Sequence, residues 1–143
     1  MRLPSCELGW LVLLLLALFA RPALSEGEQP AATQFVVRPW AYEKLRAAHE
    51  HIAKREHDAA LRVLAQLERK RPNDHEQALI HQARSHLFAT TERYAEAAQQ
   101  LEQMLALEAL PAATQLQSRY LLGQLYLALQ RYDAAAAVLS QWL

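Results

Sequence analysis

Hydrophobic and small residues recur along this chain at helical spacing, in three stretches that lie about 37 residues apart. Each stretch opens with a ring-bearing residue and runs into alanines, at residues 57–60, 94–97 and 132–135. Upstream of the last alanine of each stretch, a small residue recurs at one fixed spacing: Ala48, Ser85 and Gly123. A ring-bearing residue recurs at a second, shorter spacing: His51, Phe88 and Tyr126. A period of this size is typical of stacked helical units, each of which buries its apolar face against its neighbours.

The apolar periodicity from Trp40 onward predicts six helices, over residues 40–54, 58–70, 76–90, 95–107, 114–129 and from 132 to the end. Pro72 and Pro111 stand between predicted helices, and Asn73 or Asp74 can cap the helix that follows Pro72. Short links make successive helices antiparallel pairs. Close approach within a pair needs short side chains, so we expect three contacts: Ala48 with Ala60, Ser85 with Ala97, and Gly123 with Ala135.

These positions resemble the tetratricopeptide repeat, which carries small residues, rings and a terminal proline in this order. The match covers repeats at about 41–74, 78–111 and 116–143. It departs from the family where the usual aromatic residue is replaced, at Lys44, His81 and Arg119. The resemblance implies an all-α fold, an α-solenoid of about three tetratricopeptide-type helical hairpins.

The chain before the repeats predicts two further segments. Residues 1–25 indicate a secretory signal peptide, because 8–20 are apolar but shorter than the about 20 residues of a membrane span, and 23–25 offer small residues for cleavage. An uncleaved anchor is the alternative, since Arg21 and Pro22 follow the apolar run. Residues 26–39 predict a flexible tether, and 40–143 the repeat domain. In both cases we expect the repeats to lie outside the cytoplasm, with no integral membrane domain after signal removal.

The charge balance excludes one class of partner. Lys and Arg number 15, and Asp and Glu number 15, so the formal net charge is zero. A balanced chain has no electrostatic drive toward nucleic acid. Cys6, the single cysteine, lies ahead of the apolar run.

No constellation of residues indicates catalysis, a cofactor or a metal. The six histidines include no His-Glu-x-x-His pair, and we interpret His51 and His57 as replacements for repeat aromatics and the other histidines as surface or groove residues. The glutamates fit solvated helix faces: Glu43, Glu50, Glu76, Glu92, Glu96 and Glu102. We therefore expect a protein that is not an enzyme.

The resemblance implies a concave groove lined by the first helix of each hairpin, which accepts a peptide or a partner helix. By position, the lining is rich in amides and aromatics and nearly uncharged: Tyr42, Leu45, His49, Ile52, Leu79, Gln82, His86, Gln117, Tyr120 and Gln124. Some of these residues would alternatively pack against neighbouring helices.

A narrower resemblance rests on residues 41–45, 107–111, 120–126 and 138–143. These segments are similar to periplasmic tetratricopeptide proteins of Gram-negative bacteria that accompany TonB-type energy transduction. The resemblance implies an accessory of outer-membrane transport whose partners are TonB, ExbB or ExbD. The alternatives are a generic periplasmic scaffold for envelope assembly, or the N-terminal fragment of a larger tetratricopeptide regulator or enzyme.

The chain stops inside an apolar helix at residues 141–143, whereas a solenoid needs a polar cap at its end. Truncation of a longer protein is one explanation. If the chain is complete, we expect a homodimer through the C-terminal hairpin.

Overall fold

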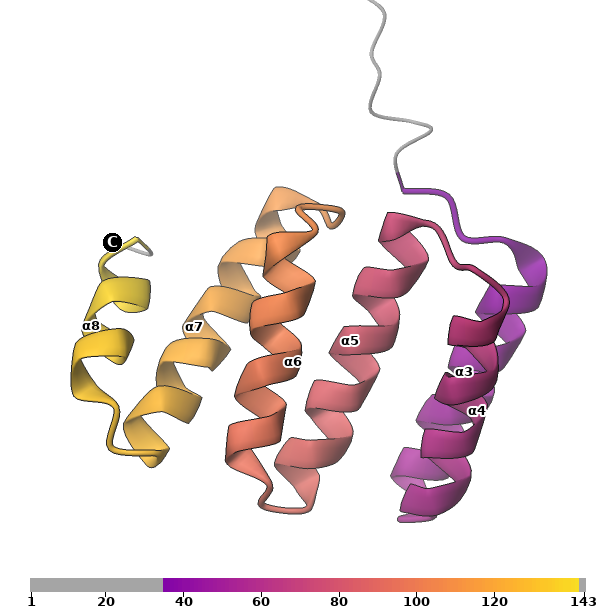
Figure 1. Cartoon of the computed structure of the whole chain (residues 1–143), viewed down its shortest axis with the longest axis horizontal. Coiled ribbons are helices and arrows are strands. Elements are labelled where there is room, and N and C mark those ends of the chain that lie inside the picture. Colours follow the sequence, from indigo (N-terminus) through magenta and orange to yellow (C-terminus); the bar gives the residue numbers. More distant parts are fainter. Residues whose placement is uncertain (1–34, 142–143) are drawn as a thin grey trace, which may run out of the picture. The chain divides into compact units, whose positions relative to one another are not determined.

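The computed structural model describes residues 35–141, and within them every regular element is an α-helix. The expected signal peptide and most of the expected tether lie outside the described residues. Six helices follow one another along the chain (Figure 1): α3 Pro39–Ala53, α4 His57–Arg69, α5 Asp74–Thr90, α6 Tyr94–Ala106, α7 Ala112–Ala128 and α8 Tyr132–Ser140. In this part of the chain, none of the helices is long and apolar enough to cross a membrane.

The six predicted helices are confirmed, and the predicted boundaries of the first five lie within two residues of the observed ones. The sixth begins at Tyr132 as predicted and ends at Ser140, short of the predicted end at the last residue. Pro39 occupies the first turn of α3, where its missing N–H leaves no intrahelical bond unmade. Asn73 caps α5, since its side chain accepts a hydrogen bond from the backbone N–H of Glu76 at 2.8 Å. The Glu76 side chain in turn accepts a hydrogen bond from the Asn73 backbone N–H at 3.0 Å, which completes a capping box.

Consecutive helices pack as pairs, α3 with α4, α5 with α6, and α7 with α8. The same three-residue turn closes each pair, and its middle residue has a positive φ: Arg55 at 60°, Glu92 at 58° and Gln130 at 58°. The backbone N–H of the following residue bonds to a carbonyl five positions back, as Glu56 N does to His51 O at 2.8 Å. This is the Schellman arrangement, which satisfies carbonyls that the helix end leaves free.

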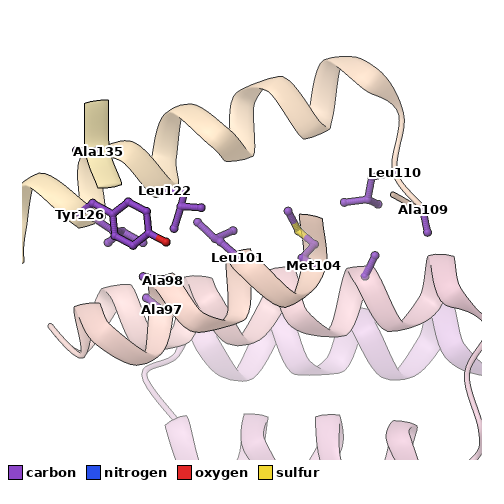
Figure 2. Packing of buried hydrophobic residues seen from close by; sticks show 11 residues of the cluster. Ala97, Ala98, Leu101, Met104, Ala109, Leu110, Leu122, Tyr126 and Ala135 are labelled. Atoms are coloured by element: carbon purple, nitrogen blue, oxygen red, sulfur yellow. The ribbon is translucent and has the colours of Figure 1, made fainter. Parts of the chain in front are cut away.

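The pairs meet at two joints that differ. At the first joint, α5 packs against both α3 and α4. At the second joint, α7 packs against α6. The largest hydrophobic cluster spans this second joint (Figure 2), where Leu101 and Met104 of α6 face Leu122 of α7 and Leu110 of the connection. Because Ala109 and Leu110 are 5% and 3% exposed, the connection between α6 and α7 is part of the core.

The small residues of all three pairs are buried, as expected. Ser85 contacts Ala97 as predicted, since its hydroxyl donates to the Ala97 carbonyl oxygen at 3.0 Å. At Gly123, the atoms nearest to the position of an added Cβ belong to Leu139, one turn beyond Ala135. A Cβ at Gly123 would stand 2.5 Å from Leu139 Cδ2 and 2.6 Å from its Cγ. The absence of a side chain there lets α8 approach α7.

Candidate functional site

The ten predicted groove residues all lie on α3, α5 and α7, the first helices of the three pairs. Six of them are exposed: Tyr42, His49, His86, Gln117, Tyr120 and Gln124. Leu79 and Gln82 are half-buried. Leu45 and Ile52 are 7% and 5% exposed and belong to hydrophobic clusters, so most of their surface packs against neighbouring helices.

Three of the predicted residues meet in one depression of about 530 Å³, at the end of the first joint where the α3–α4 turn lies. We call it the histidine depression, and its lining comes from α3, the turn, α4 and α5: His49, Ile52, Ala53, Arg55, His57, His86 and Thr90. His49, Ile52 and His86 were expected in the groove. Four residues of the lining were not.

The electrostatics of the histidine depression follow from its imidazoles. Partial burial lowers the pKa of His49, and the neighbouring His86 lowers it further because two imidazolium charges repel. Nδ1 of His57 is buried and has no hydrogen-bond partner among the described residues. The Thr90 hydroxyl donates to the Leu87 carbonyl at 2.8 Å, so it faces its own helix.

The sequence did contain a signal for this cluster. His49 and His86 occupy the same position in consecutive repeats, and residues at one position of adjacent repeats lie side by side. His57 was interpreted only as a substitute for the tyrosines at Tyr94 and Tyr132, which hid its part in the lining. His57 is the first residue of α4, so the turn between the two antiparallel helices places it near the end of α3.

Glu76 is the second residue that the sequence interpretation missed. We expected it on a solvated face, and this was wrong, because its side chain is fully buried. Arg38 donates to it from its backbone N and from Nε, both to Oε1 at 2.9 Å, and from Nη2 to Oε2 at 2.5 Å. The Arg38 guanidinium and the capping bond from Asn73 lower the pKa of Glu76 to about 2. The Asn-x-x-Glu spacing of residues 73–76 was the signal that could have identified it.

The segment before α3 therefore contacts α5. Besides the Arg38–Glu76 pair, Asn73 Nδ2 donates to the Val36 carbonyl at 3.1 Å. The ring of Phe35 meets that of His75 edge-on, with centroids 5.3 Å apart. These contacts fasten the end of the expected tether to the start of α5.

Two other histidines are buried, which corrects their expected surface position. His75 and His81 are each 9% exposed. Nδ1 of His75 lies 2.6 Å from the Ala109 carbonyl, and Nδ1 of His81 lies 2.9 Å from Gln100 Oε1. Within residues 35–141, no three His, Cys, Asp or Glu side chains come close enough to hold a metal ion.

The ring near the end of each first helix contacts the last residue of the turn that follows. The guanidinium of Arg93 stands 4.4 Å from the centroid of the Phe88 ring, and that of Arg131 stands 4.6 Å from the Tyr126 ring. In the first pair, Nδ1 of His51 instead lies 2.5 Å from Glu56 Oε2. The first pair thus replaces a cation–π contact with a hydrogen bond that involves an imidazole.

Comparisons with known proteins identify no relative. No family model matches the chain, and neither a curated protein nor a solved structure matches it.

Proposed function

We propose that this protein is an exported protein–protein interaction module without catalytic activity of its own, built as an α-solenoid of three tetratricopeptide-type hairpins. The observation that carries the proposal is the repetition of one backbone geometry. The same turn closes three helix pairs, with positive-φ residues about 37 residues apart at Arg55, Glu92 and Gln130. Repeats that are alike in backbone present a continuous surface from successive first helices, and such surfaces bind extended segments or helices.

The exposed side chains of the first helices support a binding role. Tyr42 is 58% exposed on α3 and Tyr120 is 43% exposed on α7. Tyrosine supplies contact area at a small cost in conformational entropy, which is why it is enriched in binding surfaces. The amides of Gln117 and Gln124 lie on the same helix and can bond a partner's backbone.

The specific partner we propose is a component of a TonB-type system, TonB, ExbB or ExbD, with the protein in the periplasm as an accessory of outer-membrane transport. This step rests on the sequence resemblance of residues 41–45, 107–111, 120–126 and 138–143. The alternatives are a generic scaffold for envelope assembly and a fragment of a larger tetratricopeptide regulator or enzyme.

Self-association through α7 and α8 is a second proposed contact. Large apolar side chains are exposed on these helices, among them Leu116 at 41%, Leu127 at 46% and Tyr132 at 63%. Apolar exposure of this kind is typical of surfaces that another chain covers. Sedimentation equilibrium tests it, and a purely monomeric mass would rule it out.

An affinity pull-down from envelope extract tests the partner. The tagged chain is compared with its Tyr120→Ala variant and with Gln99→Ala, a matched change of an exposed residue on α6. We expect mass spectrometry to recover TonB, ExbB or ExbD with the wild type and with Gln99→Ala, and to recover several-fold less with Tyr120→Ala. Recovery of other envelope proteins, weakened in the same way, would support the scaffold alternative.

A further inference from the structure

The histidine depression has an unusual lining for a chain whose net charge is zero. Histidines from three helices line it, His49, His57 and His86, and Arg55 of the turn lines it as well. None of the described residues that line it is acidic. A concave surface with several cationic or protonatable groups and no carboxylate is complementary to an anion.

We propose that the histidine depression binds a carboxylate side chain of a partner polypeptide, with His49 and His86 as the donors that hold it and Arg55 as the charge that attracts it. The proposal rests on the proposed binding function and names the chemistry of the partner residue. A carboxylate between His49 and His86 accepts a hydrogen bond from each imidazole and offsets part of their positive charge when both are protonated. Binding therefore strengthens as the pH falls through the titration range of histidine.

The surrounding charges are consistent with an anion rather than a cation in the depression. On α3, Glu50 lies 3.7 Å from Arg46, and in the turn Glu56 pairs with His51. On α4, Asp58 lines an adjoining depression together with Glu56 and Arg62, and Arg55 and His57 line both depressions. Glu68 of α4 accepts a hydrogen bond from Arg84 of α5. None of these acids lines the histidine depression itself, so His49 and His86 have no carboxylate beside them in its lining.

The electrostatic state of His49 points in the same direction. Its pKa lies below the ordinary 6.5 of a histidine, because it is partly buried and stands near His86. In the free protein, two positive charges in the depression are therefore unfavourable. An anionic ligand reverses this balance, because an opposite charge close to an imidazolium favours the charged form.

The shape of the depression favours a side chain over a free inorganic anion. Ile52 and Ala53 form an apolar part of its wall, which can cover the methylenes of a glutamate. Its volume of about 530 Å³ leaves room for the peptide backbone beside that side chain. The same wall gives no favourable contact to phosphate.

The test compares two acetylated and amidated pentapeptides, one with a central glutamate and one with a central glutamine, both otherwise alanine. The whole chain is titrated with each while the imidazole proton resonances are followed by NMR. We expect the glutamate peptide to shift the resonances of His49 and His86 and to raise the pKa of His49. Its affinity should rise about tenfold between about pH 7.5 and about pH 5.5, because the donors gain charge over this range.

Variants separate this inference from the proposed function. His49→Gln combined with His86→Gln should abolish the pH dependence, while Gln99→Ala, an exposed change on α6 outside the predicted groove, should leave it intact. Circular dichroism confirms that each variant is folded. Equal binding of both peptides would overturn the carboxylate site and leave the binding module standing. An affinity that does not change with pH, or no shift of either histidine, would also overturn it.

Discussion

The two joints of this protein share apolar packing but differ in the polar groups that accompany it. At the first joint, Ile80 and Ala83 of α5 belong to one apolar cluster with Leu45 of α3 and Leu64 of α4, and the buried Glu76 pairs with Arg38 ahead of α3. At the second joint, α7 meets α6 through Leu101, Met104 and Leu122, in the cluster that Figure 2 shows. Both joints therefore depend on apolar area, and the first adds a charge-dependent contribution that varies with pH.

This difference separates two tasks that a repeat protein has to perform. Apolar packing is non-directional and provides most of the stability. Buried polar groups need defined partners, so they fix the relative register of the elements that carry them. The protein thus places its most specific contacts at the joint that also carries the histidine depression.

Truncation of Leu101 breaks the second joint and has the largest expected effect. Leu101 is 1% exposed, and Leu101→Ala should lower the free energy of unfolding by about 3 kcal/mol, since it leaves a cavity among packed side chains. The loss should be the same at acidic and neutral pH. Urea unfolding followed by circular dichroism measures it, with the exposed Leu121→Ala as a control that should cost less than about 0.5 kcal/mol. A strongly pH-dependent loss would remove the contrast between the joints.

Neutralisation of Glu76 tests the first joint. Glu76→Gln should lower the free energy of unfolding by about 2–3 kcal/mol at neutral pH, because the pKa of Glu76 falls from an ordinary 4.5 to about 2. A depressed carboxyl pKa stabilises the fold above the unfolded-state value, and this contribution disappears as the pH drops from about 4.5 to about 2. Urea midpoints of the wild type and variant should therefore converge in acid. Glu43→Gln, an exposed surface change, is the matched control, and a gap that persists in acid would contradict the assignment.

The substitution Gly123→Ala tests whether there is space for a side chain between α7 and α8. A Cβ there meets Leu139 at 2.5 Å, so Gly123→Ala should destabilise the protein by about 1 kcal/mol, the overpacking cost exceeding the gain in helix propensity. In a Leu139→Ala background the sign should reverse, because only the propensity gain is left. Thermal unfolding of the four proteins in this cycle provides the measurement. A stabilising Gly123→Ala in the wild type would mean that α8 shifts freely.

The smallest expected effect concerns Glu102, a carboxylate of α6 that contacts α7 at the second joint. The Tyr126 hydroxyl donates to Glu102 Oε1 at 2.5 Å, and burial followed by this bond raises the pKa of Tyr126 to about 12. Glu102→Gln should lower the free energy of unfolding by about 0.5–1 kcal/mol. It should also lower the pKa of Tyr126, although burial still keeps that pKa above 10. A raised tyrosine pKa stabilises the fold below about pH 10, and the stability is lost as the pH rises toward 12. Carbon NMR of the Tyr126 ring measures the change, and an unaltered pKa would assign the whole shift to burial.

The helices were predictable from the sequence because periodicity and prolines act locally. The three turns were predictable in length, but not in conformation, because Arg55, Glu92 and Gln130 adopt a positive φ that glycine usually occupies. The αL conformation is imposed there by the antiparallel packing on either side. No pattern within the turn itself indicates it.

The candidate site was predictable only in part, because it depends on the distances between helices. His49 and His86 were identified by their repeat position, whereas Arg55 and His57 enter the lining through the direction of the turn. Glu76 was misassigned because its partner, Arg38, lies in a segment that composition describes as a tether. Hydrophobic periodicity describes positions within one helix, so it does not predict a contact between residues 38 positions apart.

The two connections between helix pairs should also differ in how a protease treats them. Ala109 and Leu110 are packed in the core, so cleavage between α6 and α7 requires local unfolding. Arg69 and Lys70, by contrast, are exposed at the end of α4 and present basic residues to trypsin. A nick after Lys70 would divide the chain into two fragments that remain associated through the Arg38–Glu76 pair and the packing of α5 on α3 and α4.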